Sequence, residues 1–163
     1  MKYTRFEELP VWQDAIELAV RIFTFTKRPV FRPYRNIRDQ IERASMSISN
    51  NIAEGFERGT TLETLTFLYI SRGSSGETRS VLCLCERLPE FVDLRSEISD
   101  LNRRAETISR QLSAWAHSLQ NTDIRGQRYL TDKVRSKTKE ASEREEFLKE
   151  LEEIRNPKPQ PKF

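Results

Sequence analysis

The sequence has few of the residues on which enzyme chemistry most often depends. Its 163 residues include two cysteines and one histidine. Cys83 and Cys85 stand two positions apart with no second pair, so their spacing offers neither a zinc framework nor a disulfide scaffold. The single histidine, His117, excludes a pair of Glu-x-x-His metal motifs, and no glycine-rich phosphate-binding motif is present. We therefore predict no metal, no cofactor and no catalysis.

Long apolar runs are also missing. No stretch approaches the roughly 20 apolar residues that a membrane-spanning helix needs, and residues 1–5 are not followed by an apolar segment of the signal-peptide type. These features predict a cytoplasmic protein without a membrane partner. Hydrophobic residues make up 36% of the chain and charged residues 33%, which indicates a lean core under a charged surface.

Helical spacing fills the stretches between the glycines and prolines. It predicts four long helices, at about residues 10–27, 34–56, 61–88 and 94–119. With short connections, four such helices form an all-α, up-down-up-down four-helix bundle, which we assign to residues 1–120. The expected inner faces of the first three helices are Trp12, Ala15, Ile16, Ala19, Ile22 and Phe23; Ile37, Ile41, Ala44, Ile48 and Ile52; and Phe67, Ile70, Ser71, Ser74, Thr78, Val81, Cys85 and Leu88.

The fourth helix carries the clearest pattern. Its apolar residues alternate steps of four and three, as in a heptad seam, and they leave His117 facing outward. The seam consists of Leu94, Ile98, Leu101, Ala105, Ile108, Leu112, Trp115 and Leu119.

Residues 121–163 differ in composition and are expected to form a charged C-terminal helical extension. Residues 125–139 hold six basic residues and one acid, and residues 140–155 hold seven acids and three bases. The basic half could contact phosphate, or the whole segment could be a solvated, partly disordered tail.

The second and third helices contain serine, asparagine and glycine at positions where helix propensity is poor. Local rules allow Gly73 to end one helix and a capping box of Ser74 and Glu77 to start another. Close packing of two helices through small residues is the alternative explanation. A polar stripe favours close packing, because it flanks the predicted core of the second helix at steps of three and four: Gln40, Arg43, Ser47, Asn51, Glu54 and Arg58. Such a stripe suits a hydrogen-bond network between helices or between subunits, or it is simply a solvated face.

These residues also carry a family resemblance. The segments Trp12-Gln13-x-Ala15, Gln40-Ile41-x-Arg43-Ala44, Ser47 to Arg58 with the block Asn51-Ile52-Ala53-Glu54-Gly55, and Arg72-Gly73-Ser74-x-x-Glu77 occur in order. Over about residues 5–119 the chain resembles the bacterial four-helix-bundle proteins first met in intervening sequences of large-subunit ribosomal RNA genes. That family includes the accessory variability proteins of diversity-generating retroelements. The resemblance implies a continuous third helix, a homopentameric assembly with a basic surface and, for the retroelement members, binding to RNA and to a reverse transcriptase.

Positive charge is unevenly distributed. Residues 21–38 hold six basic residues and no acid, and Phe31 and Tyr34 among them could stack on an unpaired base. On the third helix two arginines stand one heptad apart. The candidate nucleic-acid-binding residues are Lys27, Arg28, Arg32, Arg35, Arg38, Arg72 and Arg79, and the candidate structural or interface residues are those of the polar stripe together with Ser74 and Glu77.

Three hypotheses follow. The first is a non-catalytic, homo-oligomeric adaptor that binds RNA, or DNA or an RNA–DNA hybrid, and assists a reverse transcriptase. The second is a protein-interaction scaffold with no direct nucleic-acid role, in which the arginines serve solubility and subunit contacts. The third, an enzyme, would need Glu54, Glu77 and Arg43 to converge on a small-molecule pocket.

Overall fold

The computed structural model describes residues 3–121 and 147–149. The chain divides into two compact units, residues 1–126 and 127–163, and the four long helices found among the described residues belong to the first. These are α1 (Pro10–Thr26), α2 (Arg35–Glu57), α3 (Thr61–Arg87) and α4 (Arg95–Gln120). Short 3₁₀ turns lie before α1 (η1, Phe6–Glu8), between α1 and α2 (η2, Pro29–Phe31) and between α3 and α4 (η3, Pro89–Leu94).

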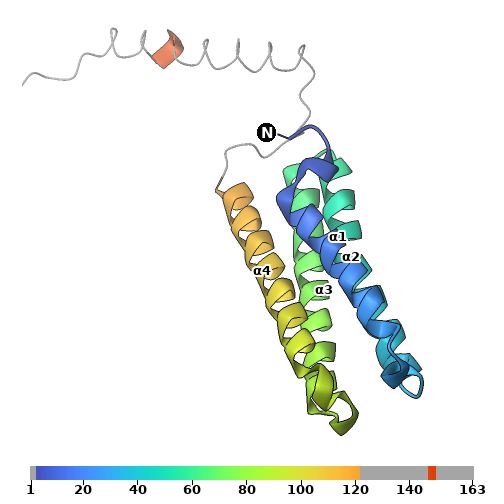
Figure 1. The fold of residues 1–163 in the computed structure, drawn as a ribbon. Helices are drawn as coiled ribbons and strands as arrows, with labels where there is room; N and C mark the ends of the chain where they lie inside the picture. The colour runs from blue at the N-terminus through green and yellow to red at the C-terminus, as the bar shows by residue number, and fades with distance from the viewer. Residues whose placement is uncertain (1–2, 122–146, 150–163) are drawn as a thin grey trace, which may run out of the picture. The chain divides into compact units, whose positions relative to one another are not determined.

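The four helices run alternately up and down and pack side by side along their lengths (Figure 1). This confirms the all-α four-helix bundle, and the helix bounds agree with the predicted ones to within about a residue. The structure describes few of the residues after 121, so the predicted domain boundary after residue 120 and the expected charged extension stay predictions. Of that extension, residues 147–149 are helical and exposed.

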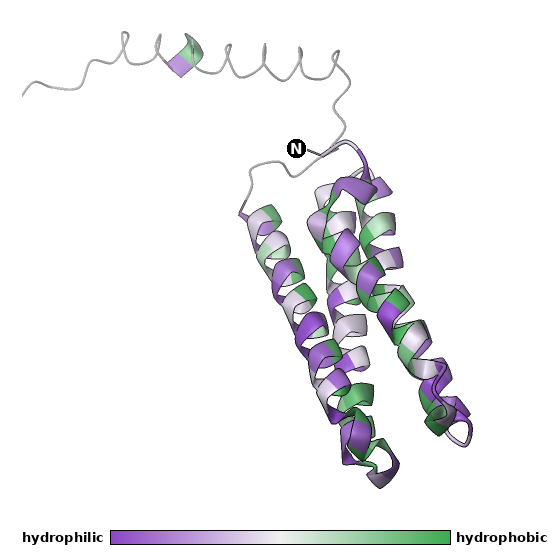
Figure 2. Ribbon diagram, in the orientation of Figure 1, coloured by the Kyte–Doolittle hydropathy of each residue, from purple (hydrophilic) through white to green (hydrophobic). Residues whose placement is uncertain are grey.

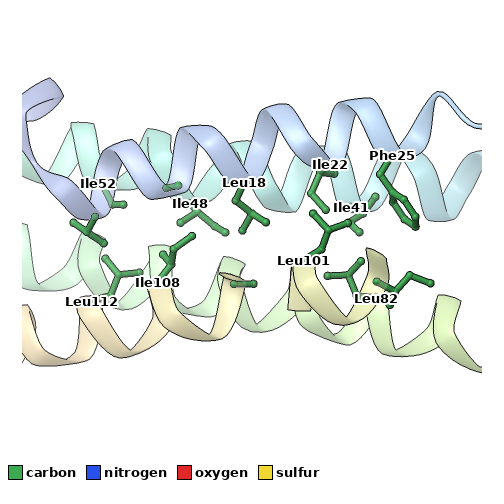
Figure 3. Packing of buried hydrophobic residues seen from close by; sticks show 14 of the residues in the cluster. Leu18, Ile22, Phe25, Ile41, Ile48, Ile52, Leu82, Leu101, Ile108 and Leu112 are labelled. Carbon is green, nitrogen blue, oxygen red and sulfur yellow. The ribbon is translucent and has the colours of Figure 1, made fainter. Parts of the chain in front are cut away.

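The core consists of aliphatic and aromatic side chains from all four helices (Figure 3). The seam of α4 is confirmed: its five central residues, from Ile98 to Leu112, are at most 2% exposed, and Leu94, Trp115 and Leu119 are half-buried against the core. His117 is exposed, as expected. Hydrophobic and hydrophilic residues lie on different sides of each helix (Figure 2), which is the amphipathic pattern of a bundle in water.

The inner face predicted for α1 is partly wrong. Ile16 is 36% exposed, whereas Val11, Leu18 and Phe25, which were not assigned to the core, are buried. The buried set steps from Val11 through Ala15, Leu18 and Ile22 to Phe25, and the competing set that contains Ile16 lies beside it on the helix. Contact with the neighbouring helices decides between two patterns that have the same period.

The inner face predicted for α3 is confirmed only in part, since Ser71, Ser74, Thr78 and Cys85 are buried. Ile70 is 46% exposed, and Phe67 and Val81 are only half-buried. The buried seam alternates steps of four and three and is rich in hydroxyl side chains: Thr64, Leu68, Ser71, Ser75, Thr78, Leu82 and Cys85.

These buried hydroxyls join α3 to its neighbours. Ser71 donates to the Ile48 carbonyl at 2.9 Å and Thr64 donates to the Gly55 carbonyl at 2.8 Å, both in α2. Ser75 donates to the Ala105 carbonyl of α4 at 2.7 Å. Since small side chains let the helix axes approach, the hydroxyls reach main-chain oxygens across the seams. These contacts offset the poor helix propensity of serine and threonine in α2 and α3.

The third helix continues through Gly73, as the family resemblance implied. No helix end or capping box forms at Ser74 and Glu77. The side-chain cap of α3 lies at the start of the helix, where the Thr60 hydroxyl accepts from the main-chain N–H of Glu63 and donates to the Glu63 carboxylate.

Candidate nucleic-acid interface

Five of the seven candidate cations lie at one end of the bundle, where η2 joins α1 to α2. An aromatic cluster fixes this end, since the Phe31 ring packs edge-on against Phe25 and Phe91 with 5.0 Å between ring centroids in each pair. The second connection, η3, carries Phe91, so the η2 and η3 connections pack together at this end (Figure 1).

Base stacking by the aromatic residues of this end is not supported. Phe31 is 1% exposed, so its ring is inaccessible to a base. Tyr34 is half-buried, and its ring centroid lies 5.7 Å from that of Phe91. A hydrogen bond to Glu90 raises the pKa of its phenol. Both rings contribute to folding of the connections. Sequence reasoning missed this because Phe91 lies 60 positions away from Phe31.

Some of the cations already have carboxylate or amide partners. Arg28 pairs with Glu97 at 2.5 Å, which ties the α1–α2 connection to the start of α4. Arg38 pairs with its neighbour Asp39 at 2.8 Å, and Arg79 donates from Nε to Asn102 Oδ1 at 3.3 Å.

The remaining four cations are exposed and have no hydrogen-bond or ion-pair partner among the described residues: Lys27, Arg32, Arg35 and Arg72. Three of them belong to the η2 end, and Arg72 lies on α3. Each keeps its full positive charge available to a polyanion.

The cations do not form one patch. The C-terminal end of α3 lies at the η2 end of the bundle (Figure 1), but Arg79 is eight residues and Arg72 fifteen residues from Arg87, the last residue of α3. At 1.5 Å per residue these positions are about 12 Å and 22 Å along the helix. The structure thus divides the candidate cations into a group at the η2 end and a pair along α3.

The polar stripe of α2 meets α3 within the same chain. Gln40 donates to Glu77, and Arg43 donates to the side-chain amide oxygen of Gln40 (Oε1) at 2.5 Å. The Ser47 and Ser74 hydroxyls are 2.9 Å apart.

The stripe continues toward the end of α2. Asn51 donates to the Ser47 carbonyl at 2.6 Å and to its hydroxyl at 2.9 Å. Arg58 binds Glu54 at 2.7 Å and lies over the Phe67 ring, 5.1 Å from its centroid. All eight stripe and interface residues therefore have partners inside the protomer, where they link or flank the α2–α3 seam.

The groups of the enzyme hypothesis do not converge on a pocket. Glu54 is paired with Arg58, whereas Glu77 and Arg43 both contact Gln40. A shallow recess of about 280 Å³ lies elsewhere, between α1 and α4. Its charged groups bind one another: Arg104 and Arg103 hold the pKa of Asp100 below its usual value through their hydrogen bonds.

The cysteines have no nucleophilic arrangement. Burial raises the pKa of the Cys85 thiol to about 11, and the Cys83 sulfur accepts from Asn102 Nδ2 at 3.3 Å. Across residues 3–121 and 147–149, no group of three or more His, Cys, Asp or Glu side chains could hold a metal ion. None of the helices described is long and apolar enough to cross a membrane.

Comparison with known proteins identifies the family. A search of curated proteins found no match. A solved structure of a protein of unknown function from the S23 ribosomal protein family of Bacteroides thetaiotaomicron superposes with a TM-score of 0.58 at 24% identity, and the alignment covers 65% of this chain and 97% of that one. That similarity supports the bundle fold. Residues 7–114 match the 23S rRNA-intervening sequence protein family, as the resemblance over residues 5–119 predicted. Because the match covers more than half of this chain, the chain belongs to that family.

Proposed function

We propose that the protein is a non-catalytic, homo-oligomeric RNA-binding adaptor that assists the reverse transcriptase of a diversity-generating retroelement. The observation that carries this proposal is the set of exposed cations without a partner in the described part of the chain: Lys27, Arg32, Arg35 and Arg72. Arginine guanidinium groups bind phosphate oxygens through paired hydrogen bonds, and an arginine without a carboxylate partner has no ion pair to break first.

Assembly is the second part of the proposal. A single protomer offers only a few free cations, and such a patch binds nucleic acid weakly and without choice of sequence. A closed ring repeats the patch around its axis, so that several weak contacts to one RNA add by avidity. The family resemblance favours five copies. RNA is the expected ligand, with DNA or an RNA–DNA hybrid as related polyanions.

Light scattering of the purified protein at about 50 mM and 500 mM salt tests both parts. We expect the mass of an oligomer at both concentrations and an absorbance ratio that reports bound nucleic acid at low salt. A structured RNA should bind with an affinity that falls as salt rises, with a log–log slope near −0.7 to −0.9 for each phosphate contacted. A protein that ignores RNA at about 50 mM salt, or that runs as a single protomer, would refute the proposal.

A protein-interaction scaffold is the second candidate, and one feature of α1 favours it. Ile16 and Val20 are 36% and 60% exposed, one turn apart on the same side of the helix, which is an apolar surface suited to a protein partner. Charge reversal separates the two candidates. Substituting Lys27, Arg32 and Arg35, the exposed cations of the η2 end, by glutamate should weaken RNA binding by an adaptor, whereas a scaffold should keep its protein partner.

A further inference from the structure

The middle of α3 is unusual in its charge. Between Glu63 and Glu86 the helix has a single acid, Glu77, and Glu77 accepts a hydrogen bond from Gln40 at the α2 seam. Arg72 and Arg79 lie on the other side of α3, since Arg79 contacts Asn102 of α4 and a full heptad separates the two arginines. The side of α3 near α4 therefore carries Arg72 and Arg79 and none of the acids of α3 between Glu63 and Glu86, a stretch of about six turns in which Glu77 lies toward α2.

Two exposed glycines adjoin these arginines on α3, with Gly76 beside Arg72 and Gly73 between Gly76 and Glu77, and no contact among the described residues requires them. A Cβ added at Gly73 or Gly76 would meet no atom within 4 Å, and neither residue has a positive φ. Both are exposed in the interior of a continuous helix, where glycine is the least favourable residue after proline. Gly55 is different, because a Cβ there would lie 2.7 Å from the Phe67 Cβ. The packing of the protomer explains Gly55 but leaves Gly73 and Gly76 without a role.

Tyr69 completes the surface. The residue is 45% exposed, and its hydroxyl accepts from Gln120 Nε2 at 2.7 Å, which holds the side chain toward α4. We name Tyr69, Arg72, Gly73, Gly76, Arg79 and Ser80 the α3 outer face. It presents a smooth helix surface with one cation on either side of the glycines and an aromatic ring one turn before the first cation.

The exposed arginines of α4 make a useful contrast. Arg103 pairs with Asp100 and Arg110 pairs with Glu106, both at 2.5 Å on the same helix. Their charges are compensated locally, whereas Arg72 has no partner among the described residues and Arg79 has only a neutral amide. The arginines of α3 and α4 therefore carry the same formal charge, but those of α3 are more available to phosphate.

We infer that the α3 outer face binds the sugar–phosphate backbone of RNA, an inference that rests on the proposed function. Arg72 and Arg79 are seven residues apart, or about 10 Å along the helix, and each contacts a phosphate of the same strand. The strand passes over Gly73 and Gly76, where the absence of side chains lets a phosphate or ribose approach the helix backbone. Tyr69 offers its ring to a base at the end of this path.

Matched pairs of substitutions test the inference. The probe is a fluorescent single-stranded RNA of about 20 nucleotides, titrated by anisotropy at several salt concentrations. Arg72→Gln with Arg79→Gln should weaken binding at least tenfold and reduce the magnitude of the salt slope by about 1.4, which corresponds to two phosphate contacts on a single strand. Arg103→Gln with Arg110→Gln removes the same charge from α4 and should change the affinity less than threefold.

Steric closure of the path is tested separately. Gly73→Leu with Gly76→Leu retains both arginines and replaces glycine by a better helix former, so folding should not suffer; circular dichroism at rising temperature checks this. Binding should fall at least fivefold. The inference is overturned if this variant binds RNA as the wild type does, or if it loses its oligomeric mass, which would make the α3 outer face a contact between copies of the chain.

The outcomes also separate this inference from the proposed function. If the wild type does not bind RNA, the proposed function fails and the inference fails with it. If the wild type binds RNA and the α3 variants bind equally well, the proposed function stands and RNA binds elsewhere, with the η2 end as the remaining group of free cations.

Discussion

Gly55→Ala is the most informative single substitution in the fold. A Cβ built at Gly55 lies 2.7 Å from the Phe67 Cβ and 3.4 Å from the Thr64 carbonyl oxygen. Carbon atoms in contact prefer about 3.5–4.0 Å, so the added methyl group requires roughly 1 Å of displacement. Rotation of the Phe67 side chain cannot provide it, because the backbone fixes the position of a Cβ atom. The α2 and α3 helices must separate instead.

The magnitude follows from three contributions. Forcing extra volume into a packed site costs about 1–3 kcal/mol. Separation of the helices also stretches the 2.8 Å hydrogen bond from Thr64 to the Gly55 carbonyl, which contributes about 0.5–1.5 kcal/mol. Alanine recovers up to about 1 kcal/mol of helix propensity. The net loss in the free energy of unfolding is about 2 kcal/mol, or a fall of roughly 1 M in the urea midpoint for an m-value near 2 kcal/mol/M.

Gly73→Ala is the matched control for urea unfolding followed by circular dichroism. The same change of residue in a helix meets nothing within 4 Å at Gly73, so the propensity gain of about 1 kcal/mol is uncompensated and the midpoint should rise. The reasoning about the α2–α3 contact would be refuted if both variants shifted in the same direction, or if Gly55→Ala were as stable as the wild type.

Three further predictions concern the core. Leu112→Ala should lower the free energy of unfolding by about 2–5 kcal/mol because Leu112 is fully buried, whereas Val20→Ala, on the exposed side of α1, should change it by less than about 0.5 kcal/mol; urea unfolding measures both. Ser71→Ala should cost about 1 kcal/mol, since it leaves a buried main-chain carbonyl of α2 without its side-chain donor, and no loss would mean that the hydroxyl does not contribute to the seam. At pH 8 a maleimide should label Cys83 before Cys85, because burial raises the pKa of Cys85 to about 11 and keeps it protonated; mass spectrometry of a time course detects the order, and equal rates would contradict the assignment of Cys85 to the core.

The sequence was sufficient to predict the four helices but not which side of each helix is buried. Helix bounds could be predicted because proline and glycine mark the connections. The buried face of α4 could be predicted because the residues between its seam positions are almost all polar. In α1 two sets of apolar residues share the period of a helix, one containing Leu18 and one containing Ile16. A periodic pattern cannot choose between them, since the choice depends on where α2 and α4 lie.

The seam of α3 shows a different limit. Its heptad spacing is as regular as that of α4, but Thr64, Ser71, Ser75 and Thr78 occupy four of its seven positions. The expected inner face of this helix included Ser71 and Thr78 but neither Thr64 nor Ser75, because serine and threonine are generally expected in water. Their burial is favourable only when a carbonyl of the neighbouring helix stands opposite each hydroxyl, and that condition becomes visible only in three dimensions.

Prediction of the candidate site was limited in the same way, because the sequence does not show which side chains lie opposite each arginine. Counting charges identified Arg28 and Arg72 as equivalent cations, yet Arg28 is paired with Glu97, which is 69 positions away in sequence, and Arg72 has no partner among the described residues. Availability to phosphate is a property of an arginine together with its surroundings. The sequence did contain one usable signal of it, namely the stretch of α3 from Glu63 to Glu86 with a single acid. Because an arginine in a helix is most easily neutralised by a carboxylate three or four positions away, an arginine far from any acid on its own helix face is more available to a polyanion than one in a charge-rich segment. By this criterion Arg72 and Arg79 should contribute more to RNA affinity than Arg103 and Arg110, although all four contribute equally to the net charge.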